Sequence, residues 1–298
     1  MSESIRTIVD PPRLPAREAE GHKGNYGRVL IVGGSPGMIG APALSANAAL
    51  RSGAGLVTMA IPAAIQQTTA PLCPCATSVA LACDDAGAPV PAAIGQLHSQ
   101  AAKVDVVAIG PGLGTSSGAR EVLRAALDLP LPLLIDADGL NLLCKIDNWA
   151  AGRKGPTVLT PHPGEFSRLT GLQISEIQSD RQTRAILAAT EWSDQAGEEN
   201  PLTVLLKGAG TVVTDARRCY VNATGNPGMA TGGAGDILTG MIAALIGQGL
   251  DGFDAACLGA FLHGRAGDLA ADSIGQVSLI ATDLLDFLPP AFRSHSSR

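Results

Sequence analysis

Aromatic residues, charged residues and long apolar runs are all scarce in this chain of 298 residues. Only 3% of the residues are aromatic and 16% are charged, and the formal net charge is −6. Nucleic-acid surfaces need clustered Lys and Arg or platforms of aromatic side chains, so we expect no nucleic-acid partner. No apolar run approaches the roughly 18 residues of a membrane span, so we expect no membrane partner either.

The six cysteines follow neither a disulfide framework nor a metal-binding pattern. Cys73, Cys75 and Cys83 lie close together, but a structural zinc site takes four ligands and no fourth Cys or His stands near. We therefore expect reduced thiols and no metal site built from them. Residues 1–20 lack the apolar core of a secretion signal, which predicts a cytoplasmic protein with a flexible amino-terminal tail. Residues 291–298 are expected to form a second tail.

Short apolar, β-branched runs alternate with helical patterns from residue 27 onward. The six runs that predict buried parallel strands are 28–33, 56–61, 104–109, 133–136, 157–160 and 203–206. Residues 211–214 and 219–222, joined by a short polar link, predict a hairpin. Helices are expected at 43–51, 175–195, 237–246 and 254–272. This alternation predicts one α/β domain over residues 21–290, with a central, mostly parallel sheet and helices on both faces.

The most informative segment is the glycine-rich run Asn226–Asp236, which leads into a predicted helix. Its glycines remove Cβ atoms where the backbone must turn and approach a ligand. Consecutive N–H groups at a helix start attract anions, and phosphate is the natural guest. Asp236 would repel phosphate, so we interpret it as a base that takes a hydroxyl proton while the amides hold a phosphoryl group. A helix N-cap is the alternative role for Asp236.

Four more polar loops follow predicted strands, so they are expected at the same sheet edge. They are Ile109–Thr115, Asp136–Asn141, Thr160–Glu165 and Lys207–Thr211. His162, fixed between two prolines, is either a ligand contact or an exposed turn residue. Glu165 could cap the next helix or organise Mg²⁺ through water. Lys207 and the loop after it suit phosphate or adenosine, or else form a β-turn with a solvated lysine.

Two familiar nucleotide-binding signatures are not met. No Gly-Lys pair is followed by Ser or Thr, as a Walker loop requires. The glycines at 112, 114 and 118 have one residue too many for the dinucleotide-binding fingerprint. These two signatures therefore do not say which ligand the loops bind.

A resemblance to a known family rests on six segments that occur in order along residues 21–290. They are 23–28, 33–38, 109–115, 160–165, 207–211 and 226–236. Together they resemble the ADP/ATP-dependent NAD(P)H-hydrate dehydratases of the ribokinase-like superfamily. The run from Asn226 to Asp236 is specific to this family, although Ala234 stands where many relatives have Ser. The resemblance implies a ribokinase-like α/β fold.

The resemblance also implies a cofactor-repair reaction. In this family a phosphoryl group from ADP, or from ATP in eukaryotic members, goes to the ring hydroxyl of (6S)-hydrated NADH or NADPH. Transfer from ADP leaves AMP, and elimination of phosphate then restores the cofactor, with Mg²⁺ as the metal. Asp236 would be the base, and Ala41, Gly112, His162 and Asp236 would contact the hydrated dinucleotide. The adenosine phosphate would be held by Lys207, Gly208, Ala209, Gly210, Thr211 and Gly235.

The family likeness suggests partners as well. A homotetramer is expected. Some relatives carry an epimerase domain ahead of the dehydratase, and twenty leading residues are too few to supply one, so a separate NAD(P)H-hydrate epimerase is expected as a functional partner. Two other functions stay open: a kinase of a vitamin-precursor alcohol, and a non-catalytic dinucleotide sensor. The donor, ADP or ATP, and the preference for NADH or NADPH stay open too.

Overall fold

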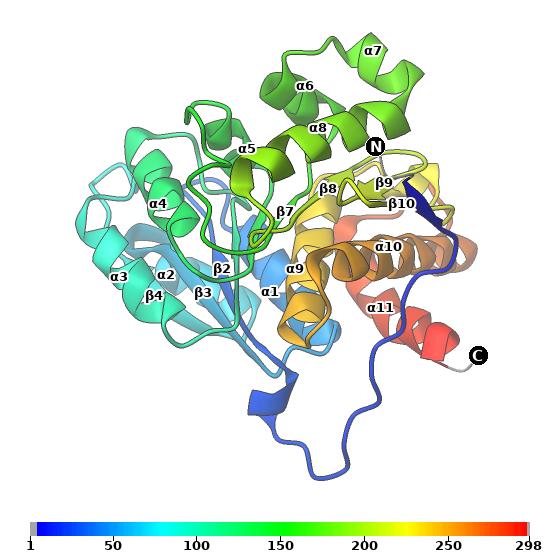
Figure 1. The fold of residues 1–298 in the computed structure, drawn as a ribbon. Coiled ribbons are helices and arrows are strands. Elements are labelled where there is room, and N and C mark those ends of the chain that lie inside the picture. Colours follow the sequence, from blue (N-terminus) through cyan, green and yellow to red (C-terminus); the bar gives the residue numbers. More distant parts are fainter. Residues whose placement is uncertain (1–4, 297–298) are drawn as a thin grey trace.

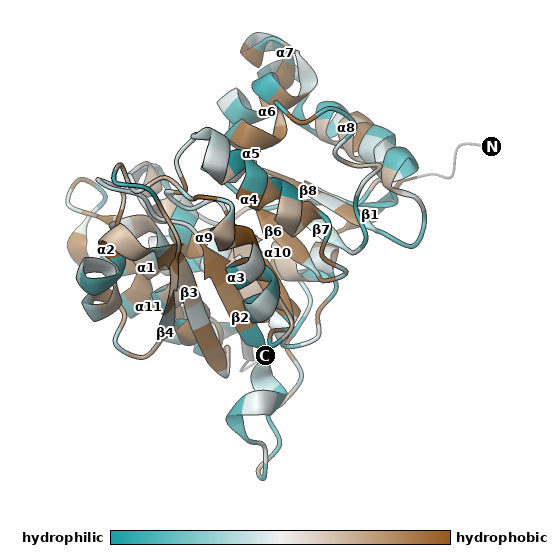
Figure 2. Cartoon of the chain, turned by 90° about the vertical axis from the view of Figure 1, so that its left-hand side faces the viewer, coloured by the Kyte–Doolittle hydropathy of each residue, from teal (hydrophilic) through white to brown (hydrophobic). Residues whose placement is uncertain are grey.

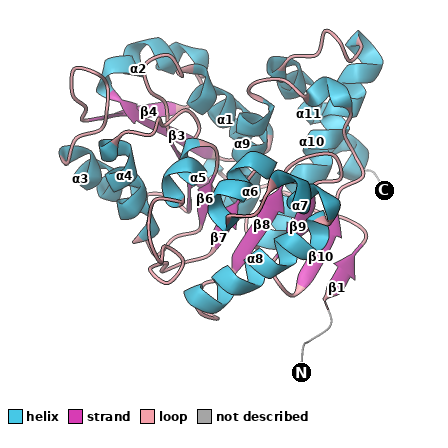
Figure 3. Ribbon diagram, turned by 90° about the horizontal axis from the view of Figure 1, so that it is seen from above, coloured by secondary structure: helices cyan, strands magenta, loops and turns pink. Residues whose placement is uncertain are grey.

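A ten-stranded sheet runs through the molecule in the computed structural model, which describes residues 5–296 (Figures 1 and 3). The strand order is β1-β10-β9-β8-β7-β6-β5-β2-β3-β4. The strands are β1 (Arg6–Ile8), β2 (Arg28–Val32), β3 (Leu56–Pro62), β4 (Thr77–Leu81), β5 (Val106–Ile109), β6 (Leu133–Ile135), β7 (Thr157–Leu159), β8 (Leu202–Leu206), β9 (Val212–Thr214) and β10 (Arg218–Val221). Within the described residues only β9 runs antiparallel to its neighbours. The mostly parallel sheet and the hairpin of β9 and β10 confirm the prediction from the sequence.

Helices cover both faces of this sheet (Figure 1). The helices are α1 (Gly40–Arg51), α2 (Ala63–Thr69), α3 (Ala92–Ala101), α4 (Ser117–Leu127), α5 (Asp138–Leu143), α6 (Pro163–Thr170), α7 (Ile174–Ser179), α8 (Arg181–Ala196), α9 (Ala234–Gly247), α10 (Gly252–Ile274) and α11 (Ala281–Ser296). Short 3₁₀ turns are η1 (Lys23–Tyr26), η2 (Ala70–Leu72) and η3 (Pro227–Met229). Over the described part of the chain, none of the helices combines the length and apolarity needed to cross a membrane.

Successive strand residues serve two separate cores, because side chains in a strand alternate between the faces of a sheet. Ile31 packs into the core under α1, α9, α10 and α11. Its neighbour Leu30 packs into the core under α3, α4, α5, α6 and α8. The strands are accordingly brown, that is, apolar, in Figure 2. Burial on both faces explains why these strands have no polar alternation in the sequence.

Both segments that we expected to be tails enter the folded domain. In the amino-terminal segment, β1 pairs in parallel with β10 and covers that edge of the sheet. At the other end α11 continues through residues 291–296, because Leu284, Leu288 and Ala291 form a buried stripe at helical spacing. The tail predictions were therefore wrong for residues 6–8 and 291–296. Residues 1–4 and 297–298 lie outside the described residues.

One expected helix is divided in the structure. The pattern at 175–195 predicts a single helix, but α7 ends at Ser179 and α8 begins at Arg181. The carboxylate of Asp180 accepts a hydrogen bond from the backbone N–H of Thr183 and so caps α8. Asp is a favoured N-cap residue, and this local bond stops the first helix.

Both tryptophans of the chain lie in one aromatic cluster. The ring of Trp192 on α8 lies 5.6 Å from that of Trp149 and 6.2 Å from that of Phe166 on α6, both edge to face. Such pairs add about 0.5–1.5 kcal/mol each to the apolar burial. The cluster joins α8 to α6, the helix that begins with the Pro-Gly-Glu sequence after His162.

Helices α1 and α9 approach so closely that a side chain at Gly240 has no room. A Cβ on Gly240 would lie 1.9 Å from the carbonyl oxygen of Ser45. We expect Gly240→Ala to lower the free energy of unfolding by about 1–3 kcal/mol, because the two helices must separate. Urea unfolding measures the change. Gly95→Ala on α3 is the control, since nothing lies within 4 Å of a Cβ there; equal effects of the two variants would contradict the packing argument.

Candidate active site

The predicted loops meet at the carboxyl edge of the parallel strands. Strand order reverses between β2 and β5, and such switch points form ligand crevices in α/β sheets. Here the Gly34 N–H donates to the Pro111 carbonyl oxygen at 2.9 Å, which joins the two loops. A Cβ on Gly112 would lie 3.1 Å from the Cβ of Ala41. The structure thus brings Gly112 and Ala41, two predicted substrate contacts, side by side.

A buried ion pair lies beneath the loops. Lys207, which follows β8, places its Nζ 2.7 Å from Oδ1 of Asp136, which follows β6. The other carboxylate oxygen, Oδ2, accepts a hydrogen bond of 2.7 Å from the Thr239 hydroxyl on α9. Asp136 is 1% exposed. The pair therefore ties the sheet edge to the first turns of α9.

Both members of this pair carry charge at neutral pH. Burial alone would raise the pKa of Asp136, but the Lys207 ammonium and the hydrogen bonds from Lys207 and Thr239 lower that pKa overall. Burial alone would lower the pKa of Lys207, but the Asp136 and Glu165 carboxylates raise it overall. A buried pair with this geometry keeps each partner ionised.

Asp236 lies in the first turn of α9, directly after residues 232–235, which we call the glycine turn. The N-cap of α9 is Gly233, with a left-handed φ of 93°, so Asp236 is not the cap residue and that alternative is wrong. Burial and the nearby Asp136 raise the pKa of Asp236 and Lys207 lowers it, which leaves a pKa of about 7. A carboxylate poised near neutrality is suited to accept a proton.

The glycine turn and the Lys207 ammonium lie side by side. The first N–H groups of a helix have no intrahelical partner and point outward at its positive end. A Cβ on Gly235 would lie only 3.4 Å from Lys207 Nζ, so the ammonium sits directly beside this turn. Backbone amides, an ammonium and a carboxylate of raised pKa thus meet at the start of α9. This arrangement can bind a phosphoryl group next to a base.

His162 proves to be the N-cap of α6, a role not considered from the sequence. Its Nδ1 accepts hydrogen bonds from the N–H groups of Gly164, at 3.0 Å, and Glu165, at 3.3 Å. Its own N–H donates to Glu165 Oε2 at 2.8 Å, which completes a capping box. The His162 side chain is nonetheless 49% exposed. One face of the imidazole therefore stays free for a ligand.

The charges around His162 keep its ring neutral. Burial and the nearby Lys207 and Arg168 cations lower the pKa of His162. Because Nδ1 accepts two bonds, the hydrogen-bond network places the ring proton on Nε2, 3.3 Å from Glu165 Oε1. The ring thus presents a fixed tautomer.

Glu165 is the second carboxylate of unusual pKa in this site. It is 5% exposed, and its Oε2 lies 3.9 Å from Lys207 Nζ. Burial raises the pKa of Glu165 to about 7, although Lys207 opposes the shift. Glu165, in the first turn of α6, therefore faces the same ammonium as Asp136, which follows β6.

Asp138 holds the loop after β5. Its Oδ2 accepts a 2.9 Å bond from the Gly114 N–H, and its Oδ1 accepts one of 3.3 Å from the Asn141 amide. Ala137, between Asp136 and Asp138, has a positive φ of 49°. This unusual backbone conformation lets Asp136 contact Lys207 while Asp138 contacts the loop after β5.

The predicted nucleotide loop, Lys207–Thr211, is mostly exposed and sharply turned. Gly208 and Gly210 have φ values of 141° and 64°, and the Thr211 hydroxyl donates to the Gly208 carbonyl oxygen at 2.9 Å. The Arg181 guanidinium on α8 donates to the carbonyl oxygens of Leu206 and Lys207, at 2.8 and 3.1 Å. The loop is thereby anchored at its start while residues 208–211 face solvent.

Asp136 and Thr239 were not predicted as site residues. The sequence pointed to the loop Asp136–Asn141 but assigned Asp136 no role. Thr239 was hidden because it lies within the apolar stripe of α9 and is fully buried. The motif Asp-Ala-Asp after a buried strand is the signal that could have identified Asp136.

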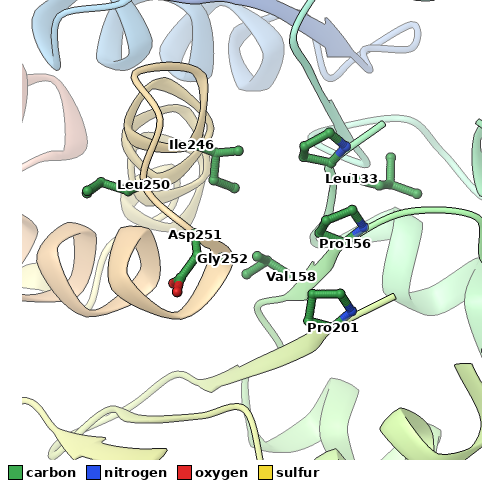
Figure 4. Close-up of a pocket in the computed structure, with 9 residues that line it drawn as sticks. Leu133, Pro156, Val158, Pro201, Ile246, Leu250, Asp251 and Gly252 are labelled. Atoms are coloured by element: carbon green, nitrogen blue, oxygen red, sulfur yellow. The ribbon is translucent and has the colours of Figure 1, made fainter. Parts of the chain in front are cut away.

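The pocket in Figure 4 lies away from these residues. Its walls come from the amino-terminal ends of β6, β7 and β8 and from the link between α9 and α10. It is lined by Pro132, Leu133, Pro156, Val158, Pro201, Ile246, Leu250, Asp251 and Gly252. The candidate site lies at the carboxyl ends of the same strands, so this pocket plays no part in it.

The fold and the site define a ribokinase-like α/β protein. The same fold occurs in ribokinase of Arabidopsis thaliana, with a TM-score of 0.57 over 90% of this chain and 99% of that one. At 12% identity that likeness shows the fold alone. It confirms the predicted fold class.

Comparison with known families identifies the group more closely. The NAD(P)H-hydrate dehydratase family model matches residues 29–290, so the chain belongs to that family. An ADP/ATP-dependent NAD(P)H-hydrate dehydratase of Bacillus subtilis, crystallised with ATP and Mg²⁺, is 32% identical, with a TM-score of 0.78 over 95% of this chain and 94% of that one. This membership confirms the resemblance found in the sequence.

Two curated relatives differ in how much of their own length this chain matches. The bifunctional NAD(P)H-hydrate repair enzyme of Moorella thermoacetica is 48% identical over 284 residues, which are 95% of this chain and 52% of that protein. The chain therefore spans about half the length of the bifunctional relatives it matches. The ADP-dependent (S)-NAD(P)H-hydrate dehydratase of Neisseria meningitidis is 38% identical over 92% of this chain and 87% of its own length.

Proposed function

We propose that this protein dehydrates (6S)-hydrated NADH or NADPH with ADP as phosphoryl donor, giving NADH or NADPH, AMP and phosphate. The observation that carries the proposal is the meeting of Asp236, the Lys207 ammonium and the glycine turn at the start of α9. The names of the relatives from Neisseria and Bacillus support the substrate and the donor.

The site residues suit a transfer followed by an elimination. The ring hydroxyl attacks the terminal phosphorus of ADP while Asp236 takes its proton, and AMP leaves. The glycine-turn amides and Lys207 stabilise the charge on the transferred group. Phosphate then departs with the electrons of its C–O bond, pushed by the ring nitrogen, and loss of a ring proton restores the double bond. Hydroxide itself would leave far more slowly than phosphate.

The two ligands are assigned to two different sets of residues. Ala41 and Gly112, at the switch point between β2 and β5, and His162, after β7, would contact the hydrated dinucleotide. The loop Lys207–Thr211 and Gly235 would hold the adenosine phosphate. The close approach of Ala41 to Gly112, and of Lys207 to Gly235, supports this division.

Mg²⁺ is the metal that this reaction implies. Within the described residues no group of three or more His, Cys, Asp or Glu side chains is arranged to hold a metal. Mg²⁺ needs no such group, because it is usually bound by one or two carboxylates together with substrate phosphates and water. Glu165, buried and beside Lys207, fits as that carboxylate, acting through water. When bound, Mg²⁺ would neutralise phosphate charge.

Reduced nicotinamide is the decisive readout for the proposed reaction. Hydrated NADH is incubated with the protein, Mg²⁺ and either ADP or ATP, and recovery of dihydronicotinamide absorbance is followed with release of inorganic phosphate. We expect recovery with ADP. A stable phosphorylated dinucleotide without recovered absorbance would instead show a kinase. Binding without either product would show a sensor.

The rate of the proposed reaction should rise with pH up to neutrality. Asp236 must be deprotonated to act as base, and its pKa is raised to about 7. We therefore expect kcat/KM to fall about tenfold per unit of pH below that value and to level off above it. A pH series of the assay measures this. A profile that is flat from about pH 5 to 7 would contradict the role of Asp236.

The compartment, the oligomeric state and the partner activity are proposed from the likeness to the family. We propose a cytoplasmic homotetramer, which light scattering after gel filtration would test by its mass. The bifunctional names of the relatives support a functional link to an NAD(P)H-hydrate epimerase activity.

A further inference from the structure

We infer that Asp268 on α10 is a positioning residue for the glycine turn and Asp236. The inference rests on the proposed function and adds a residue outside the reacting groups. It concerns residues 224–231, which we call the leading loop because they lead from β10 to the glycine turn. The hydrogen bonds of Asp268 go to this loop.

Asp268 holds the leading loop with both of its carboxylate oxygens. Oδ2 accepts a 3.1 Å hydrogen bond from the Gly225 N–H, and Oδ1 accepts one of 3.1 Å from the Asn226 side-chain amide. Asn226 in turn uses its own Oδ1 to accept from the Gly228 N–H at 3.0 Å, which caps η3. One carboxylate thus fixes a backbone group and the residue that caps the next turn.

The helix surface beside Asp268 is shaped to seat the same loop. A Cβ on Gly264 would lie 2.3 Å from the Thr224 hydroxyl, and one on Gly267 would lie 2.2 Å from the Met229 sulfur. The Thr224 hydroxyl also donates to the Phe261 carbonyl oxygen at 2.8 Å. At Gly264 the backbone of Thr224 therefore lies directly on the α10 backbone, so the loop is seated closely on the helix next to Asp268.

A continuous series of backbone bonds links this anchor to the glycine turn. Met229 N–H donates to the Asn226 carbonyl oxygen at 3.1 Å, and Thr231 N–H donates to that of Met229 at 2.9 Å. Ala234 N–H then donates to the Thr231 carbonyl oxygen at 3.4 Å. Movement of Asn226 is thus transmitted to residues 232–235, whose amides must meet the phosphoryl group.

The pairing requires an acid at position 268 and an amide at position 226, which allows an exchange test. In Asp268→Asn the new NH₂ group must face either the Asn226 amide or the Gly225 N–H, donor against donor, so one of the two contacts is lost. In Asn226→Asp two carboxylates face each other. In the double variant the new amide at position 268 accepts from the Gly225 N–H and donates to the new carboxylate at position 226. That carboxylate still accepts from the Gly228 N–H, so all three contacts are restored with the partners reversed.

We expect each single variant to lower kcat for hydrated NADH by roughly 10- to 100-fold, since small misplacements of reacting groups cost that much. The double variant should return to within about threefold of the parent enzyme. Asp272→Asn is the matched control: this exposed residue lies one turn further along α10, and within residues 5–296 its carboxylate makes no hydrogen bond or ion pair. It should keep the parent kcat.

The exchange also separates positioning from simple stability. A merely structural contact would lower the melting temperature without changing the kcat of the folded enzyme, and that result would overturn the inference. So would a double variant no better than the single ones. If the parent protein fails to restore NADH, the proposed function falls, and calorimetric titration with AMP then applies the same test. Weaker AMP binding in the single variants, recovered in the double, would still support Asp268; equal binding in all four proteins would reject it.

Discussion

Replacing Asp236 by Asn should reduce turnover of hydrated NADH by about 10²–10⁴-fold, the usual contribution of a general base. The substitution keeps the shape of the side chain and the bond from the Ser45 hydroxyl to the carbonyl oxygen of residue 236. It removes only the group that accepts the proton. Calorimetric titration with AMP should give an affinity close to that of the parent, because the amides and Lys207 remain.

The same variant should be more stable than the parent at neutral and alkaline pH. Asp236 has a pKa of about 7 in the fold and 3.8 in its ordinary state. Because the pKa of Asp236 is raised in the fold, its contribution to stability is fully present below pH 3.8, the ordinary pKa, and is lost as the pH rises through about 7. Asn cannot ionise, so it escapes that loss. Thermal unfolding of both proteins should show a difference in melting temperature that grows as the pH rises from 3.8 to about 7. In the activity assay, turnover by Asp236→Asn within tenfold of the parent would refute the assignment of Asp236 as the base.

Replacing Lys207 by Met should damage both the fold and the reaction. Asp136 would be left buried beside the Thr239 and Thr160 hydroxyls, without its ammonium partner. Removing one member of a buried ion pair typically costs about 3–5 kcal/mol of stability. The positive charge beside Gly235 would also be lost, so we expect turnover to fall about 10²-fold or more. Urea unfolding and the absorbance assay measure the two effects.

A double variant distinguishes these effects. Lys207→Met combined with Asp136→Asn removes the uncompensated charge, and the Thr239 hydroxyl can still donate to the new amide oxygen. Most of the lost stability should return, because a buried pair replaced on both sides costs little. Activity should not return, since the ammonium is still missing. A stable but inactive Lys207→Met single variant would contradict the buried-pair argument.

The sequence predicted the sheet well where burial leaves a strong pattern. The apolar runs of β2, β3, β5, β6, β7 and β8 are buried on both faces and cannot be mistaken for surface segments. Strand β1 has only three residues, and its pairing with β10 depends on contacts more than 200 residues apart. Helix α11 was not predicted from the sequence, and its Pro289-Pro290 pair, which would ordinarily end a helix, lies inside it.

The site was less predictable, because its key contacts join distant residues. Lys207 meets Asp136 only because β6, β7 and β8 are neighbours in the sheet, and a single sequence cannot state that order. His162 was framed as a ligand contact or a turn residue, whereas its Nδ1 caps α6. Capping depends on backbone dihedral angles that the motif Pro-His-Pro only suggests.

The aromatic cluster gives the protein an intrinsic tryptophan fluorescence signal from a single location. Because Trp149 and Trp192 are the only two indoles of the chain and lie together, the ultraviolet emission arises from one place. Phe166 joins that place to α6, whose first turn carries Glu165. We expect this emission to respond to movement of the Glu165 helix with no background from indoles elsewhere, so titrations with AMP require no added dye.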